Sequence, residues 1–479
     1  MNYSIIRYIL GTVLKFESLF LLLPVFVGII YGEKSGIYFL AVSAMCLAAG
    51  VLLSFRKPKS YVFYAVEGFV SVALSWIVLS LFGALPFWMS GEIPAFTDAL
   101  FETVSGFTTT GASILSDVEA LSRSCVFWRS FTHWIGGMGV LVFVLAVFPM
   151  RGGQTMFLMK AESPGPSVEK LVPRVKTTAT ILYGVYTIMT LVEMVILAVT
   201  GMSLFDAVTL SLGTAGTGGF GILNDSVGSY APHLQVIIAI FMILFGVNFN
   251  IYYLLLRKKI GAALRSEELR VYLGIILVSG LLIAWNIREL FPDPLEALRH
   301  AFFQVASIIT STGYSTVDYD LWPSFSTTIL VTLMFIGACA GSTGGGIKVS
   351  RVIIMVKSLL KEMFLTSHPH GVREEKLDGR NVDLPTRRSI HIFVVGYALV
   401  FMVSLLLISM DNFDFTTNFT AVAATVNNTG PGLSLVGPTA NFSIFSVFSK
   451  YVLIFDMLAG RLELLPMILL FAPVTWKSR

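Results

Sequence analysis

The sequence predicts an all-α polytopic membrane protein, and three observations support this fold class. Hydrophobic residues make up 55% of the 479 residues, while charged residues make up 13%, about half of their share in soluble globular proteins. Apolar runs of about 20 residues, long enough to cross a bilayer as a helix, recur along the whole chain. Basic and acidic residues alternate between the gaps that separate these runs. A soluble enzyme is therefore nearly excluded.

Ten apolar runs are candidate membrane spans. The first run is expected to be a retained span and not a signal peptide, because no small-residue cleavage site separates Phe20–Tyr31 from the next run. The runs cover residues 8–31, 36–55, 62–89, 125–150, 177–201, 232–256, 269–291, 324–361, 389–410 and 442–473.

Charge sorts the gaps between the runs into two sides. Alternate gaps are basic, as in residues 56–59, 257–270 and 348–388, while the other gaps are acidic. By the positive-inside rule the basic gaps and both termini face the cytoplasm. The net charge of +4 gives no basic stripe for nucleic acid, and the three cysteines lie too far apart in the sequence to imply a disulfide framework or a zinc site.

Four of the outward gaps contain copies of one sequence unit. The copies Phe96–Gly111, Leu204–Gly219, Leu298–Gly313 and Phe415–Gly430 align without insertions, and each ends at a glycine. In the second copy Gly218 fits the last position as well as Gly219 does. The chain therefore contains a fourfold internal repeat.

The stretch before each glycine is too short to cross a membrane. Its roughly 10–12 residues span about 15–18 Å as a helix, half of what a crossing needs, so the chain must enter and return. Non-helical backbone at membrane depth is tolerated only where protein buries it or where it lines a watery cavity. Four such returns predict a central pore, and the partly negative C-termini of four half-helices favour a cation in it.

The peptides at the four tips are the predicted cation site. Neutral backbone carbonyls are the expected ligands for a dehydrated monovalent cation, and glycine lets the backbone approach the axis. The hydroxyls of Thr110, Thr217, Thr312 and Thr429 are expected to add ligands at the inner end. No carboxylate ring lies at the tips, which argues against a divalent ion. The predicted residues are Thr109, Thr110, Gly111, Thr217, Gly218, Gly219, Ser311, Thr312, Gly313, Asn428, Thr429 and Gly430.

Two further features lie inside apolar runs. A glycine-rich break interrupts the run 324–361 and predicts a flexible loop beneath the cation site, with a packing kink as the alternative. Arg461 is a cation at membrane depth, where it must face the pore or a carboxylate; the alternative is a salt bridge to Asp456 or Glu463. The residues of these two features are Gly341, Ser342, Thr343, Gly344, Gly345, Gly346, Lys348 and Arg461.

These segments, with GACAGSTGGGIKVSR (Gly337–Arg351) and MLAGRLELLP (Met457–Pro466), resemble the Trk/Ktr/HKT potassium-uptake superfamily and specifically its TrkH-type bacterial membrane subunit. The resemblance covers essentially the whole chain. It implies four pseudo-symmetric M1–P–M2 repeats, similar to those of K⁺ channels, around one pore. The implied units are an N-terminal two-helix hairpin at 1–60 and repeats at 61–152, 153–262, 263–365 and 366–479, the third with a broken M2 and the gate loop.

The resemblance also implies a function. Glycine at all four filter positions implies potassium uptake across the bacterial inner membrane, with K⁺ held by filter carbonyls and with a gate formed by the glycine-rich loop and Arg461. It implies a homodimer and a cytosolic RCK-type, TrkA-like regulatory subunit. A nucleotide, NAD or ATP, would bind that partner, and no cofactor is expected in this chain. The loops Arg151–Lys176 and Lys361–Arg388 are the expected docking sites.

Other interpretations stay open at this level. A Na⁺-permeable pathway of the HKT type is the main alternative within transport, and a membrane-embedded enzyme is the alternative from another class. The choice between a gated channel and an ion-coupled symporter is undecided. The stretch Gly216–Gly221 matches G-x-G-x-x-G by its letters, but no strand–helix unit surrounds it, so dinucleotide binding is disfavoured.

Overall fold

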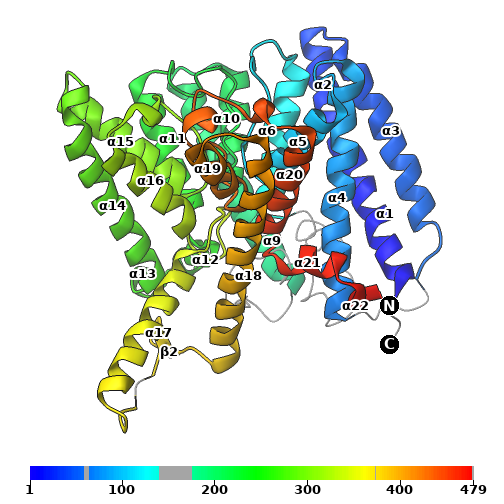
Figure 1. Ribbon diagram of the computed structural model, residues 1–479. Coiled ribbons are helices and arrows are strands. Elements are labelled where there is room, and N and C mark those ends of the chain that lie inside the picture. Colours follow the sequence, from blue (N-terminus) through cyan, green and yellow to red (C-terminus); the bar gives the residue numbers. More distant parts are fainter. Residues whose placement is uncertain (59–63, 140–174, 373, 477–479) are drawn as a thin grey trace.

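The computed structural model describes residues 1–58, 64–139, 175–372 and 374–476, and the regular secondary structure of these residues is almost entirely helical (Figure 1). The chain begins with a hairpin of α1 (Tyr3–Phe20), α2 (Leu22–Tyr31) and α3 (Ser35–Ser54). α1 packs along α3, where Gly11 and Gly50 let the two backbones approach closely. The hairpin lies on one flank of the remaining helices (Figure 1).

Four units of the same design follow the hairpin, and each consists of a long outer helix, a short buried helix and an inner helix. The outer helices are α4 (Ala65–Ser90), α9 (Val175–Val199), α14 (Glu267–Ile287) and α18 (Leu384–Ile408). The short half-helices are α5 (Phe96–Phe107), α10 (Leu204–Gly216), α15 (Pro294–Ile309) and α19 (Phe415–Val426). The inner helices are α6 (Arg123–Gly137), α11 (Pro232–Phe245), α16 (Ser324–Ile336) and α20 (Val447–Arg461).

Smaller elements connect the units and extend beyond them. Five short 3₁₀ turns, η1 (Arg288–Leu290), η2 (Tyr319–Leu321), η3 (Ser409–Asp411), η4 (Ser434–Val436) and η5 (Phe442–Ile444), lie within the described residues. The others are α12 (Phe249–Leu256), α13 (Ile260–Leu264), α17 (Val349–Ser367), α21 (Leu465–Phe471), α22 (Pro473–Trp476) and an antiparallel pair, β1 (Lys376–Leu377) with β2 (Arg380–Asn381).

The four units close into a ring through the half-helices. Each half-helix packs against the inner helix of its own unit and against that of the preceding unit: α10 on α6, α15 on α11, α19 on α16, and α5 on α20. The last of these contacts joins the fourth unit back to the first. The half-helices lie together in one half of the molecule (Figure 1).

Three of the four half-helices carry a side-chain cap at their outer ends, and all four are largely buried in their C-terminal halves. The side chains of Ser203, Asp293 and Asp414 accept hydrogen bonds from the first-turn amides of α10, α15 and α19, as N-caps do. Every residue of α5 from Ala99 to Phe107 is buried. The C-terminal parts of the half-helices therefore do not face lipid, which is what a return within the membrane requires. α15 has 16 residues and is longer than the predicted 10–12, because Pro294 starts its first turn four residues before the repeat unit.

The inner helices are more broken than the sequence indicates. Six helices among the described residues are long and apolar enough to cross a membrane, or seven if the bent pair α11–α12 counts as one. The predicted spans 232–256 and 442–473 are not continuous, since α11 and α12 meet at 89° and three residues separate the end of α20 from the start of α21. The break within 324–361 is present, between α16 and α17. Residues 140–150 of the run 125–150 lie outside the described part.

The N-terminus and α22 lie at the same end of the molecule, the end from which α17 projects (Figure 1). This arrangement agrees with the prediction that both termini share one side. The predicted unit boundaries at 60/61 and 152/153 fall outside the described residues, as does most of the predicted docking loop Arg151–Lys176. The second predicted docking loop, Lys361–Arg388, contains the end of α17 and the β1–β2 pair.

Candidate functional site

The four tip peptides share one backbone conformation. Their first residues, Thr109, Thr217, Ser311 and Asn428, have φ between 54° and 57°, and their third residues, Gly111, Gly219, Gly313 and Gly430, have φ between 76° and 95°. Gly219, and not Gly218, therefore occupies the position equivalent to the other three glycines. Thr217 is equivalent to Thr109 and not to Thr110, so the predicted set of four inner hydroxyls mixes two positions of the peptide.

The tip peptides contact one another in a closed ring. A Cβ atom on any of the four glycines would lie closer than 3.0 Å to a carbonyl oxygen of the next peptide. The pairs run from Gly111 to Gly218, from Gly219 to Thr312, from Gly313 to Thr429, and from Gly430 back to Thr110. Both the positive φ and this approach demand glycine at these positions.

The amides and carbonyls of the ring are used differently. The amides of Thr110, Gly218, Thr312 and Thr429 donate at 2.8–2.9 Å to carbonyl oxygens five residues earlier in their half-helices. The carbonyl oxygens of these same four residues accept no hydrogen bond from any residue that the structure describes. Buried carbonyls are normally paired, and a convergent set of unpaired ones is what a dehydrated monovalent cation requires.

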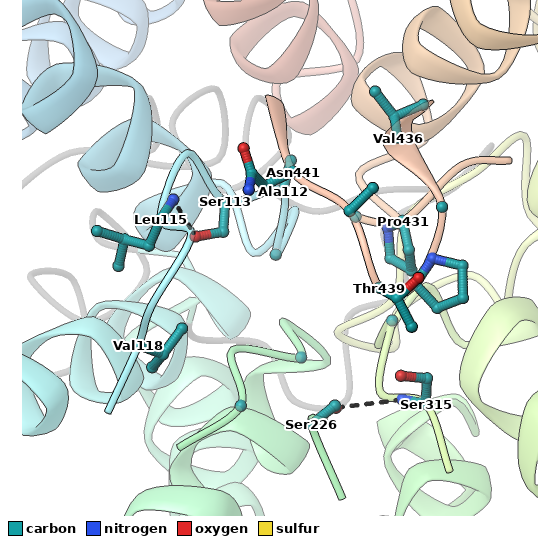
Figure 2. A pocket seen from close by; sticks show the side chains of 18 of the residues that line it. Ala112, Ser113, Leu115, Val118, Ser226, Ser315, Pro431, Val436, Thr439 and Asn441 are labelled. Atoms are coloured by element: carbon teal, nitrogen blue, oxygen red, sulfur yellow. Dashed lines mark hydrogen bonds between the residues drawn. The ribbon is translucent and has the colours of Figure 1, made fainter. Parts of the chain in front are cut away.

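A pocket lies on the outer side of this ring. All four ring glycines line it, and its volume is about 120 Å³. Figure 2 shows side chains of the return loops around it, among them Ser113, Ser226, Ser315 and Pro431, one from each loop. The ring is therefore reached from the side on which the acidic gaps lie.

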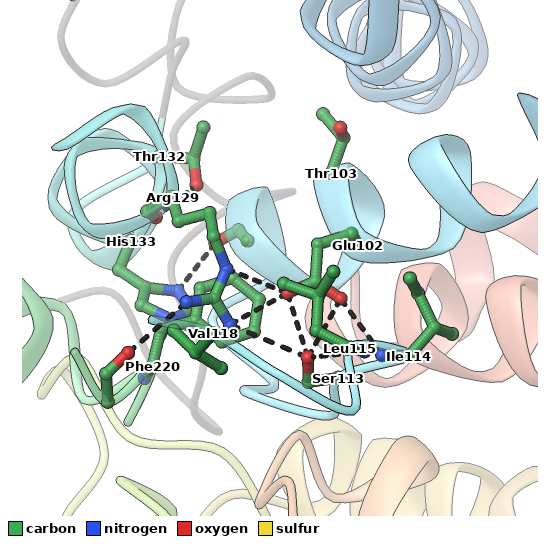
Figure 3. A network of polar contacts seen from close by, with 12 residues as sticks. Glu102, Thr103, Ser113, Ile114, Leu115, Val118, Arg129, Thr132, His133 and Phe220 are labelled. Carbon is green, nitrogen blue, oxygen red and sulfur yellow. Dashed lines mark hydrogen bonds and ion pairs between the residues drawn. The ribbon is translucent and has the colours of Figure 1, made fainter. Parts of the chain in front are cut away.

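A buried ion pair behind the first loop holds two loops in place (Figure 3). Arg129 of α6 and Glu102 of α5 are almost fully buried, with 2.8 Å between Arg129 Nε and Glu102 Oε1. The same carboxylate accepts from the hydroxyl of Ser113 and the amide of Ile114, just beyond the first ring glycine. Arg129 also donates to the carbonyl of Gly221 at 3.2 Å, and Gly221 lies just beyond the second ring glycine, Gly219.

His133 of α6 adds a second link between the two loops. Its Nδ1 lies 2.8 Å from the carbonyl oxygen of Gly106, and its Nε2 accepts from the amide of Phe220 at 3.3 Å. Both contacts are satisfied by the tautomer with the proton on Nδ1. His133 is fully buried. The sequence alone assigns no role to His133 or to Arg129, although an arginine within an apolar run is a visible signal.

The glycine-rich loop between α16 and α17 lies against the inner ends of two half-helices. The amide of Gly345 donates to the hydroxyl of Ser311 at 2.5 Å, and Gly345 also packs against the carbonyl of Asn427. Gly344 packs against the carbonyl of Thr310. The loop therefore sits directly beneath the third and fourth tip peptides.

The remaining predicted gate residues also meet at this loop. Arg461 donates at 2.9 Å to the carbonyl of Thr343, and at 2.5 and 2.6 Å to the carbonyls of Gly136 and Gly137. The ammonium group of Lys348 donates to the carbonyl of Gly344. The hydroxyl of Ser342 donates to the carbonyl of Cys339, the amide of Phe249 donates to the carbonyl of Gly341, and Gly346 has a φ of 79°.

The two carboxylates proposed as alternative partners of Arg461 have other contacts. Glu463 pairs with Arg351 of α17, and Asp456 accepts from the hydroxyl of Ser404 of α18. Arg461 itself is 8% exposed and spans from α6 to the glycine-rich loop. Its contacts thus tie the loop to the inner helix of the first repeat.

The sequence matches the TrkH family, described as cation transport protein, over residues 36–279 and 292–478. The chain belongs to the TrkH family. It is 37% identical to the Trk system potassium uptake protein TrkH of Salmonella typhimurium, over all of both chains. It is 34% identical to the Trk system potassium uptake protein TrkG of Escherichia coli, over 99% of both.

A solved structure agrees with this family membership. The potassium transporter TrkH from Vibrio parahaemolyticus superposes with a TM-score of 0.89 at 31% identity, covering all of both chains. The predicted fold class and the predicted TrkH-type membrane subunit are confirmed. The chain is a membrane transport protein and not an enzyme, as the sequence predicts.

Proposed function

We propose that this chain takes up K⁺ through the ring of tip peptides. The observation that supports this function best is the closed ring of four peptides whose buried carbonyls have no hydrogen-bond donor among the described residues. Its TrkH and TrkG relatives are named potassium uptake proteins. The selectivity filter consists of Thr109–Gly111, Thr217–Gly219, Ser311–Gly313 and Asn428–Gly430, and K⁺ is held by their backbone oxygens.

Ion uptake by the purified chain tests this function. Proteoliposomes are expected to take up Rb⁺ down an imposed gradient, and the chain is expected to rescue growth of a bacterium that lacks its own potassium uptake. A reversal-potential measurement with K⁺ and Na⁺ separates a K⁺ pathway from the Na⁺-permeable alternative. Folded protein that moves neither Rb⁺ nor Na⁺, with its cytosolic partner present, would refute the proposal.

The glycine-rich loop acts as the gate in this proposal. Its position beneath two tip peptides and the bond from Arg461 to Thr343 support a loop that blocks the inner end of the path. A cytosolic regulatory subunit of the RCK type, which would carry the nucleotide, shifts the loop, and the protein works as a homodimer in the bacterial inner membrane with its termini in the cytoplasm. The Trk system names of the relatives support a multi-subunit assembly.

Replacing Arg461 by glutamine is expected to raise maximal Rb⁺ flux. The shorter neutral side chain does not span from Gly136 to Thr343, so the closed loop loses charge-assisted bonds that are each worth about 1.5–3 kcal/mol. A rise of about tenfold corresponds to the lower end of that range. Flux is measured per folded molecule, with Arg288→Gln, an exposed site on the outer side, as the control. Unchanged flux would favour a packing role.

A further inference from the structure

Glu268 lies buried in the first turn of α14 and contacts both ends of the glycine-rich loop. Its Oε1 accepts a hydrogen bond from the amide of Ala340 at 2.7 Å and another from the amide of Ser350 at 3.1 Å. These two amides stand just before and just after residues 341–349. One carboxylate oxygen therefore ties together the two points between which the loop must move.

The surroundings of Glu268 make this contact strong and directional. The residue is only 6% exposed, and hydrogen bonds from amides to a carboxylate are roughly twice as strong as those to a neutral acceptor. Lys348, which lies within the loop and bonds the carbonyl of Gly344, acts electrostatically on this carboxylate. The carboxylate thus faces the loop from α14, while Arg461 holds it from α20.

The first turn of α14 is itself held in place by contacts with α17 and with the turn of the β1–β2 pair. The amide of Glu267 donates to Asp378 Oδ1 at 2.5 Å, and the carboxylate of Glu267 pairs with Lys357 of α17 at 2.5 Å. Lys357 also donates to the carbonyl of Lys376 in β1. The first helical turn of α14, which carries Glu268, is therefore attached to α17 and the β1–β2 pair. A movement of the β1–β2 pair would reach the glycine-rich loop through Glu268.

We propose that Glu268 is a positioning residue that holds the glycine-rich loop in its closed arrangement and sets the fraction of time for which the path is open. This inference rests on the proposed function of the loop as a gate. In this proposal one side chain holds the two residues that flank the loop, and that side chain belongs to α14, a helix that contributes nothing to the ring of tip peptides.

Glu268→Gln tests this role because it keeps the shape and removes the charge. The expected result is about a tenfold rise in maximal Rb⁺ flux per folded molecule, because both amide bonds to Oε1 change from a charged to a neutral acceptor. The Rb⁺ concentration at half-maximal flux and the Rb⁺/Na⁺ ratio are expected to stay unchanged, because the ring is untouched. Glu289→Gln, an exposed carboxylate just past the other end of α14, is the matched control and is expected to behave as the wild type.

Glu268→Asp keeps the charge on a side chain shorter by one methylene group and is expected to give an intermediate flux. This variant keeps the test decisive if Glu268→Gln does not fold. A wild type without flux would refute the proposed function itself. If the wild type conducts and Arg461→Gln raises its flux, but the folded Glu268 variants do not, the role of Glu268 alone would be overturned. A changed Rb⁺/Na⁺ ratio would also overturn it, because it would place Glu268 in the control of the ring.

Discussion

Replacing Gly219 by alanine is expected to lower Rb⁺ flux by more than tenfold and to weaken discrimination between K⁺ and Na⁺. A φ of 76° costs an L-residue about 1–2 kcal/mol. The new Cβ would also lie closer than 3.0 Å to the carbonyl oxygen of Thr312, so that oxygen must move. Because the same oxygen is a proposed K⁺ ligand, the displacement changes the site directly. Proteoliposome uptake of Rb⁺ and Na⁺ measures both effects.

Gly91→Ala is the matched control for this substitution. Gly91 ends α4 with a φ of 78°, almost the value at Gly219, yet a Cβ there would meet nothing within 4 Å. The control therefore has the same backbone cost without the contact in the ring. It is expected to lower the thermal stability slightly and to leave flux per folded molecule unchanged. Equal losses of flux in the two variants would show that the ring contact has no particular role.

The position of the ring could be predicted from the sequence because its requirements are local. Glycine is the residue that meets both a positive φ and a close backbone approach, so four glycines at equivalent places mark the tips. The choice between Gly218 and Gly219 could not be made in this way. Two adjacent glycines satisfy the same local rule, and the structure separates them by the positive φ of Gly219 and by its contact with Thr312 of the next repeat.

Features that depend on tertiary contacts were not predictable from the sequence. No glycine-rich run in the sequence marks the break between α11 and α12. The amide of Phe249, which has no partner within α12, donates to the carbonyl of Gly341 in the next repeat. Arg461 donates to backbone carbonyls of α6 and of the glycine-rich loop, whereas Asp456 and Glu463 bond Ser404 and Arg351. Closeness in sequence therefore does not identify the groups that contact a buried charge at membrane depth.

Replacing Arg129 by methionine is expected to destabilise the protein by about 3–5 kcal/mol, because Glu102 is left as an uncompensated buried charge. The loops after Gly111 and Gly219 lose a shared anchor, so the Rb⁺/Na⁺ flux ratio is expected to fall as well. Thermal unfolding in detergent measures the first effect and proteoliposome flux the second. Arg123→Met on the same helix removes an exposed guanidinium and is expected to change neither by much.

A double variant separates the charge from the anchoring. Arg129→Met with Glu102→Gln leaves no buried carboxylate unpaired, so most of the lost stability is expected to return. The amide side chain that Glu102→Gln introduces cannot replace the bond from Arg129 to the carbonyl of Gly221, so the reduced flux ratio is expected to persist. If the Rb⁺/Na⁺ flux ratio recovered together with the stability, the ion pair would contribute to folding and not to selectivity. If neither recovered, the arginine would act on the second loop without its carboxylate partner, through Gly221 and the face of Phe220, 4.0 Å away.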